Sequence, residues 1–281
     1  MTTIMPDTDW LYSVDFIEPK SKLNTMIKGD CSETLKDFDS DSIHLTCTSP
    51  PYYNARDYST WETYEAYLKF LEDTFTEVFR ITKEGRMCVV NISPIIVPRE
   101  KRSMESSRIA IPYHFFSLME EIGWKYLDDI VWVKPEGAAP NRNGGFFRHR
   151  KPVAYKPNIV TETIFVFQKP SSNLIDKIVR SYDGDILEGS LVGDNYERSN
   201  VWRFNPETRS KHSAPYPEAL TQRVISYYSY IGDVVLDPFM GSGTTAVSCK
   251  KLGRNYIGCE LHDEYIEMAN ERLEKIGGEN E

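Results

Sequence analysis

The sequence has no long hydrophobic run, no regular cysteine spacing and no excess of basic residues, and each absence narrows the range of functions. No stretch of about 18 consecutive apolar residues occurs, so no ordinary membrane-spanning helix is encoded. Residues 1–10 contain neither the basic segment nor the apolar core of a signal peptide. We therefore expect a cytoplasmic protein that does not enter a membrane.

The five cysteines are scattered, and none belongs to a C-x-x-C pair; they are Cys31, Cys47, Cys88, Cys249 and Cys259. A disulfide framework or a zinc site needs regular spacing, whereas an odd number of isolated cysteines is typical of reduced thiols in a cytoplasm. We expect neither disulfides nor a metal site.

Acidic residues outnumber basic ones by 42 to 33, and the net charge of −9 by itself argues against a nucleic-acid partner. One stretch reverses this balance, because residues 134–156 contain a single acid, Glu136. Its basic residues are Lys134, Arg142, Arg148, Arg150, Lys151 and Lys156. Since phosphates respond to local charge, this pattern predicts that any DNA contact is confined to one face.

Hydrophobic periodicity predicts strands that alternate with helices. The predicted strands are residues 42–47, 87–91, 127–133, 161–168, 200–204, 233–236 and 255–260, and the predicted helices are 63–81, 109–122, 217–230, 244–252 and 263–276. This alternation is typical of an α/β fold with a doubly wound, mostly parallel sheet. Residues 136–160 have the Pro, Gly, Asn and Arg content of a loop, and residues 171–200 are weakly patterned.

Residues 237–245 (DPFMGSGTT) form the first motif that carries chemistry. A predicted strand, a loop with Gly241 and Gly243, and a predicted helix allow the backbone to approach a ligand closely. The loop lacks the Gly-Lys-Ser/Thr of a phosphate-binding P-loop and the third glycine of G-x-G-x-x-G. Glu260 ends the next predicted strand, where an acid accepts ribose hydroxyls in nucleotide-like ligands; the alternative is a helix-capping or surface acid.

Ser49-Pro50-Pro51-Tyr52 forms the second motif, directly after another predicted strand. The two prolines fix the backbone and remove two donors, which leaves carbonyls and the Ser49 hydroxyl to accept hydrogen bonds from an amino group. Tyr52 offers a flat face for a base taken out of a duplex. Such a tetrapeptide is often only a turn, but two motifs that both follow strands indicate one site at the carboxyl edge of a sheet.

Together the two motifs resemble the signatures of the amino-group DNA methyltransferases, which methylate cytosine N4 or adenine N6. The catalytic signature precedes the cofactor signature, which is the order of that family's β group. The resemblance covers about 25–135 and 200–277 and implies a Rossmann-like fold that uses S-adenosyl-L-methionine to methylate double-stranded DNA. It also implies a catalytic domain of residues 22–135 and 201–281, with residues 136–200 as an inserted target-recognition region.

The resemblance further implies roles for individual residues. Asp237, Phe239, Gly241 and Gly243 would hold the methionine half of the cofactor, Glu260 the ribose, and Asp30 the adenine amino group. The whole implied cofactor set is Asp30, His212, Asp237, Pro238, Phe239, Gly241, Ser242, Gly243, Thr244 and Glu260. Ser49, Pro50, Pro51 and Tyr52 would form the catalytic base pocket, and Lys134, Arg142, Arg148, Arg150 and Lys151 would contact DNA.

Ser49 favours cytosine N4 as the target, because the adenine members more often carry Asp or Asn at that position of the signature. Methylation of cytosine at carbon 5 is disfavoured, since none of the cysteines follows a proline as that family's nucleophile does. The alternatives are adenine N6, an amino group in RNA or protein, or a silent DNA-binding module. The resemblance leaves open a cognate restriction endonuclease and a homodimer.

Overall fold

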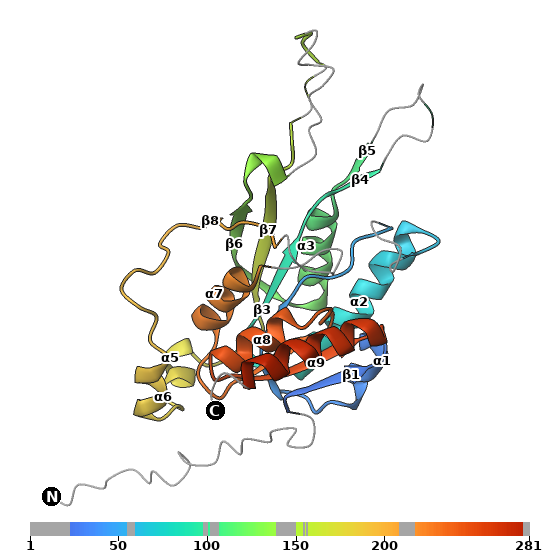
Figure 1. The fold of residues 1–281 in the computed structure, drawn as a ribbon. Helices are drawn as coiled ribbons and strands as arrows, with labels where there is room; N and C mark the ends of the chain where they lie inside the picture. The colour runs from blue at the N-terminus through green and yellow to red at the C-terminus, as the bar shows by residue number, and fades with distance from the viewer. Residues whose placement is uncertain are drawn as a thin grey trace, which may run out of the picture.

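The computed structural model describes residues 23–54, 60–97, 101, 107–138, 150–153, 155, 157–207 and 217–277. Its centre is an eight-stranded sheet in the order β1-β10-β9-β2-β3-β7-β6-β8 (Figure 1). The strands are β1 (Thr25–Lys28), β2 (Ile43–Thr48), β3 (Thr82–Ile92), β6 (Lys125–Val133), β7 (Thr161–Gln168), β8 (Val201–Arg203), β9 (Val234–Asp237) and β10 (Asn255–Glu260). All neighbouring strands are parallel except where β7 pairs with β3 and β6.

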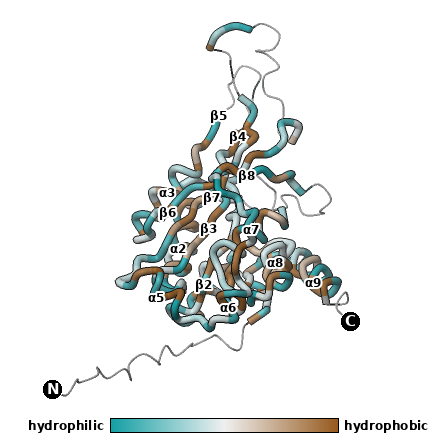
Figure 2. The backbone as a smooth tube through the Cα atoms, turned by 90° about the vertical axis from the view of Figure 1, so that its left-hand side faces the viewer, coloured by the Kyte–Doolittle hydropathy of each residue, from teal (hydrophilic) through white to brown (hydrophobic). Residues whose placement is uncertain are grey.

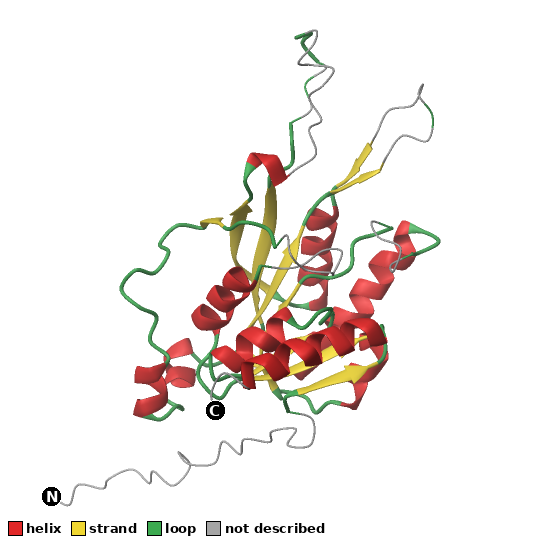
Figure 3. Cartoon of the chain, viewed as in Figure 1, coloured by secondary structure: helices red, strands yellow, loops and turns green. Residues whose placement is uncertain are grey.

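Helices cover both faces of the sheet (Figure 3). They are α1 (Cys31–Thr34), α2 (Tyr64–Ile81), α3 (Ile111–Ile122), α5 (Ile175–Val179), α6 (Gly184–Gly189), α7 (Glu218–Tyr228), α8 (Thr244–Lys251) and α9 (Asp263–Gly277), with 3-10 turns η1 (Leu35–Asp37) and η2 (Glu136–Ala138). Along β3, Cys88 and Val90 belong to one buried cluster with α2 and α3, whereas Val89 belongs to a second cluster with α7 and α8. Because alternate side chains point to opposite faces, the middle of β3 (residues 87–90) is continuously apolar, as a stretch buried on both faces must be.

Local sequence explains where the longer helices begin and end. The Thr63 hydroxyl accepts a 3.1 Å hydrogen bond from the Ala66 N–H and so caps the start of α2. Helix α3 ends at Gly123, whose φ of 114° lies in the left-handed region that favours glycine. The predicted strands and helices are found within a few residues of their expected bounds, and in Figure 2 hydrophobic residues follow the central strands. Among the described residues, no helix is long and apolar enough to cross a membrane.

Several elements were not predicted. The short strand β1, the helix α1 and a hairpin of β4 (Ile95–Val97) with β5 (Ser107–Ile109) are additions to the predicted order. The weakly patterned residues 171–200 contain the short helices α5 and α6. The range 136–200 is therefore not one separate body, because β7 within it is a central strand of the main sheet.

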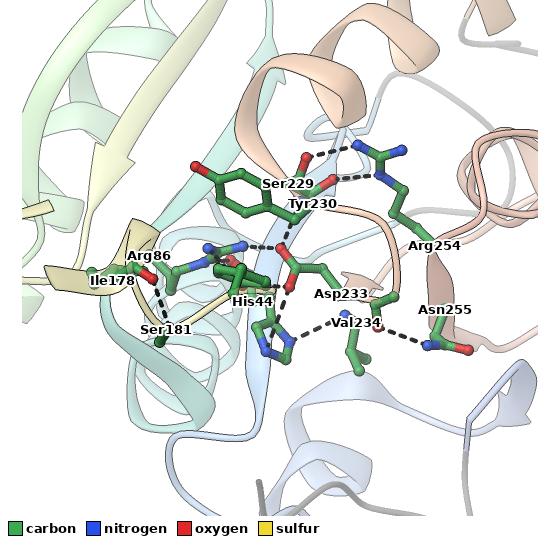
Figure 4. Close-up of polar contacts among 12 residues, drawn as sticks. His44, Arg86, Ile178, Ser181, Ser229, Tyr230, Asp233, Val234, Arg254 and Asn255 are labelled. Carbon is green, nitrogen blue, oxygen red and sulfur yellow. Dashed lines mark hydrogen bonds and ion pairs between the residues drawn. The ribbon is translucent and has the colours of Figure 1, made fainter. Parts of the chain in front are cut away.

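The segment with α5 and α6 is fixed to the amino end of the sheet, away from the ends of the strands that carry the two motifs. Tyr182 donates a 2.6 Å hydrogen bond to Asp233, which stands directly before β9. Asp233 also pairs with Arg86 (Figure 4). Asp233 further accepts a 2.8 Å bond from the Tyr230 N–H. Burial lowers the pKa of His44 in this cluster to about 3, so the His44 ring is neutral there.

Candidate active site

A cavity of about 680 Å³ lies at the carboxyl edge of the sheet and is lined by both motifs. The motif after β2 contributes Ser49, Pro50, Pro51 and Tyr52; the motif after β9 contributes Asp237, Pro238, Phe239, Gly241, Ser242 and Thr244. Asp30 and Glu260 line the same cavity. The structure thus brings together residues that are separated by about two thirds of the chain, as the positions of both motifs after strands predicted. Gly243 is not part of the lining but turns the chain into α8 with a φ of 78°.

Asp237 joins the two motifs directly. Its Oδ1 accepts hydrogen bonds from the Thr48 hydroxyl, at 2.6 Å, and from the Phe239 N–H, at 3.1 Å. Its Oδ2 accepts a 2.6 Å bond from the Thr245 hydroxyl. Burial raises the pKa of Asp237 to about 6, and the two hydroxyl donors limit that rise. At neutral pH the carboxyl group is therefore mostly ionised, and within the described parts of the chain no cation pairs with it.

Glu260 holds the glycine loop in place. Its Oε2 accepts a 2.8 Å hydrogen bond from the Gly241 N–H, and its Oε1 accepts bonds of 2.9 Å each from the N–H groups of Leu261 and His262. These bonds tie the end of β10 to the loop after β9. A Cβ at Gly243 would lie 2.5 Å from the Cβ of Ala269, so only glycine fits where the loop passes α9. The ribose-binding role of Glu260 stays a prediction.

Asp30 reaches the cavity because β1 pairs with β10, with Lys28 opposite Glu260. Its Oδ1 accepts bonds from the Ser32 N–H, at 2.9 Å, and from the Ser32 hydroxyl, at 2.8 Å, which caps α1. The predicted contact of Asp30 with an adenine amino group is untested, but its place beside Glu260 at one end of the cavity suits a nucleoside.

At the other end of the cavity, Glu162 contacts side chains that lie near the ends of three strands, β2, β3 and β6. The Tyr52 hydroxyl donates to its Oε2 at 3.4 Å, Asn91 Nδ2 donates to the same oxygen at 2.5 Å, and Lys134 Nζ pairs with Oε1. Burial, followed by the charge of Glu162, raises the pKa of the Tyr52 phenol well above its usual value. Tyr52 therefore stays neutral and acts as a hydrogen-bond donor to Glu162, and its predicted role in stacking on a base stays a prediction.

Sequence reasoning missed Asn91, Trp132 and Glu162, which all line the cavity. The available signal was weak: a polar residue at the end of an apolar strand, or an acid at the second position of β7. Thr48 and Thr245 were also missed as partners of Asp237, because a threonine beside a motif has no distinctive spacing. Register explains the placement of Glu162, since it lies opposite Trp132 in the β6–β7 pair.

The predicted DNA contacts divide into three groups. Lys134 lines the cavity rather than an outer surface, whereas Arg150 and Lys151 are exposed and lie outside the lining. Arg142 and Arg148 lie outside the described residues, as does His212 of the predicted cofactor set. The DNA-binding roles of these residues stay predictions.

Comparisons with known proteins identify the family to which this chain is similar. The family model described as DNA methylase, of the N6 and N4 methyltransferases, matches residues 43–271. The type II β methyltransferase M.BslI of Bacillus sp. (strain NEB-606) is 31% identical over 88% of this chain, which spans 27% of that longer relative. M.SmaI of Serratia marcescens, a type II methyltransferase, is 28% identical over 88% of this chain and 90% of its own length.

Solved structures confirm the predicted fold class. TTHA0409 of Thermus thermophilus, in complex with S-adenosyl-L-methionine, is 27% identical and superimposes with a TM-score of 0.72 over 89% of this chain and 93% of its own. The cytosine-N4-specific PvuII DNA methyltransferase has a TM-score of 0.64 at 20% identity and covers 89% of this chain and 88% of its own. At that low identity, the second likeness concerns the fold alone.

Proposed function

Because the chain belongs to the DNA methylase family of N6 and N4 methyltransferases, we propose that it methylates cytosine N4 at specific sites in double-stranded DNA. The methyl donor is S-adenosyl-L-methionine. The observation that carries this proposal is the single cavity in which the Ser49–Tyr52 motif and the Asp237–Thr245 motif meet, with Asp237 bonded to Thr48.

The residues of one half of the cavity fit this cofactor. Asp237 is a buried carboxylate without a cationic partner among the described residues, which suits the ammonium group of the cofactor's methionine half. We assign Glu260 to the ribose hydroxyls and Asp30 to the adenine amino group, which is supported by the presence of both carboxylates in the lining of the same cavity. When bound, the cofactor supplies an electrophilic methyl group on a sulfonium.

The chain's own residues explain how a weak nucleophile reacts. The lone pair of an exocyclic amino group is delocalised into the ring, and the Ser49 hydroxyl and the Pro50 carbonyl would accept its hydrogens and localise that pair. Tyr52 would stack on the base after it leaves the duplex. Most of the rate enhancement would come from positioning and from fixed dipoles, since no covalent intermediate with the enzyme is needed.

Cytosine is favoured over adenine by Ser49 in the signature position, and adenine N6 is the second candidate because the family covers both bases. For DNA contact we propose the stretches of 136–200 outside β7, to which the exposed Arg150 and Lys151 belong. Their charge suits phosphate contacts, which set the register of the protein on the duplex. The type II relatives support a cognate restriction endonuclease as partner.

The test is methyl transfer from labelled S-adenosyl-L-methionine to mixed-sequence duplex DNA, with RNA and protein as competing acceptors. We expect label in DNA alone, and mapping of the labelled positions would then give the recognition sequence. A Ser49→Ala variant controls for contaminating activity and should transfer little. Cofactor binding without any transfer would instead support a silent DNA-binding module.

A further inference from the structure

The order of strands separates the two halves of the cavity. The residues that suit the cofactor follow β1, β9 and β10, on one side of the Ser49–Tyr52 motif, which follows β2. Lys134 and Glu162 come from β6 and β7, on the other side. Since strands are spaced by about 4.8 Å, β7 lies roughly 10 Å from β2, a width that admits a single base ring. A base whose amino group faces Ser49 therefore has its ring edge near Lys134 and Glu162.

The Lys134–Glu162 pair is held in a fixed position. Its side chains are only 21% and 12% exposed, and Lys134 Nζ lies 4.6 Å from the centre of the Trp132 ring. Asn91, which is 2% exposed, donates to Glu162 through Nδ2, while its buried Oδ1 has no hydrogen-bond partner in the described chain. Withdrawing a charge pair from water costs free energy that the pair seldom recovers, and an unpaired buried acceptor adds to that cost. Such an arrangement is easier to explain as preparation for a ligand than as a source of stability.

Two N–H donors of Lys134 have no partner among the described residues, and they match one base better than the other. An ammonium group has three N–H donors, and one of them is engaged by Glu162. Next to its amino group, cytosine carries two acceptors in sequence, ring N3 and O2, whereas adenine carries ring N1 followed by a C–H. Two remaining donors are satisfied by cytosine, but one is left unpaired beside adenine.

From this geometry we propose that Lys134, positioned by Glu162, reads the N3–O2 edge of the target base and thereby selects cytosine. The inference rests on the proposed function and adds a determinant of base choice that neither motif contains. Pairing with Glu162 is essential, because an isolated cation would oppose the positive charge that the amino group acquires during attack. The carboxylate keeps this half of the pocket neutral overall.

The experiment compares cytosine with 3-deazacytosine, which lacks the ring nitrogen acceptor, at the mapped target position of a synthetic duplex. In the wild-type enzyme the analogue should lower kcat/KM by about ten- to a hundredfold, the range of one lost specific hydrogen bond. Lys134→Met should slow methylation of cytosine to a similar degree and respond to the analogue less than threefold. Equal sensitivity to the analogue in both enzymes would overturn the proposal.

Two further variants exclude a merely structural effect. The double variant Lys134→Met/Glu162→Leu leaves neither residue as an unpaired charge. It should still respond to 3-deazacytosine less than threefold, and its affinity for S-adenosyl-L-methionine should equal that of the wild type. Lys169→Met is the matched control, because Lys169 also pairs with a carboxylate, Asp41, and lies 5.2 Å from the centre of the Phe79 ring, but outside the cavity lining. It should retain the wild-type preference; loss of the preference there would contradict the role of Lys134.

A duplex with adenine at the target position gives the second readout. Lys134→Met should reduce the preference for cytosine over adenine at least tenfold, and equal losses on both bases would contradict the proposal. Failure of the proposed function can be distinguished from failure of this inference. If the proposed function is wrong, the wild-type enzyme itself forms no N4-methylcytosine, whereas failure of the inference changes only the comparison between the wild type and the Lys134→Met variant.

Discussion

The Thr48 hydroxyl donates a 2.6 Å hydrogen bond to the Asp237 carboxylate, across 189 positions of the chain. Thr48 directly precedes the Ser49–Tyr52 motif, and Asp237 begins the Asp237–Thr245 motif. This bond, together with the parallel pairing of β2 and β9, fixes the Ser49–Tyr52 motif relative to the Asp237–Thr245 motif. In a reaction that depends on in-line attack, a displacement of about 1 Å can cost a hundredfold in rate.

We predict that Thr48→Val lowers kcat by about ten- to a hundredfold and changes the affinity for S-adenosyl-L-methionine much less. Valine has nearly the same volume as threonine, but it cannot donate the hydrogen bond to Asp237 Oδ1. The loss of this bond should also lower the free energy of unfolding by about 1–3 kcal/mol. Steady-state kinetics, calorimetry and denaturant unfolding measure these three effects.

Thr46→Val is the matched control on the same strand. Its hydroxyl is equally buried but has no hydrogen-bond partner in the described chain, so its removal should be neutral or slightly stabilising. Similar losses of activity in both variants would show that any substitution in β2 impairs the enzyme. That result would contradict a specific role of the Thr48–Asp237 hydrogen bond in catalysis.

Asp237→Asn should weaken binding of S-adenosyl-L-methionine by at least tenfold, since a charge-assisted contact is worth about 1.5–3 kcal/mol. The amide keeps the shape of the side chain but carries no charge at any pH. Isothermal titration calorimetry at neutral pH, where the wild-type carboxyl group is mostly ionised, measures the difference in affinity. Unchanged affinity would remove Asp237 from the cofactor site.

The raised pKa of Asp237 gives a pH dependence with a definite sign. Because the pKa rises from 3.8 in the unfolded chain to about 6 in the fold, ionisation of this group opposes folding. Its contribution to stability is fully present below about pH 3.8 and is lost as pH rises through about 6. A shift of this size corresponds to about 3 kcal/mol.

Two measurements follow from that sign. The free energy of unfolding of Asp237→Asn, relative to the wild type without cofactor, should increase between pH 4 and pH 7 by roughly that amount. Cofactor affinity should show the opposite trend in the wild type, falling below about pH 6 as the carboxyl group becomes protonated. A stability difference that does not vary with pH would contradict the buried, ionised state of Asp237.

Substitution within the Ser49–Tyr52 motif should separate catalysis from cofactor binding. Ser49→Ala and Tyr52→Ala remove an acceptor of the amino hydrogens and a stacking surface, respectively, so kcat should fall far more than cofactor affinity. Single-turnover kinetics and calorimetry on the same preparations distinguish the two quantities. Wild-type turnover in both variants would mean that this motif is only a turn.

Reversal of the exposed charges at Arg150 and Lys151 to Glu should weaken DNA binding and flatten its dependence on salt. Each lost phosphate contact reduces the slope of log K against log salt by about 0.9. Lys69→Glu is the control, because Lys69 is exposed on α2 and lies outside the cavity lining. An unchanged slope after the double reversal would leave Arg150 and Lys151 as ordinary loop residues.

The strands of the sheet could be predicted because a strand buried on both faces contains consecutive apolar residues, as in residues 87–90 of β3 and 234–236 of β9. The two motifs could be predicted because prolines and glycines constrain the backbone in ways that few other residues can. Glu162 and Asn91 were not predictable, since their place in the cavity depends on the pairing of β7 with β3 and β6. The hydrogen bond from Tyr182 to Asp233 could not be predicted either, because no local sequence pattern indicates a contact between the weakly patterned segment 171–200 and the start of a strand.

The central claim is tested most directly by the identity of the methylated nucleoside. Purified protein, duplex DNA that contains the mapped site and methyl-labelled S-adenosyl-L-methionine would be incubated, and the DNA would then be digested to nucleosides for mass spectrometry. We predict labelled N4-methylcytosine, with far less formed by the Ser49→Ala variant. Labelled N6-methyladenine in its place would contradict the assignment of cytosine, and the absence of any labelled nucleoside would contradict methyl transfer to DNA.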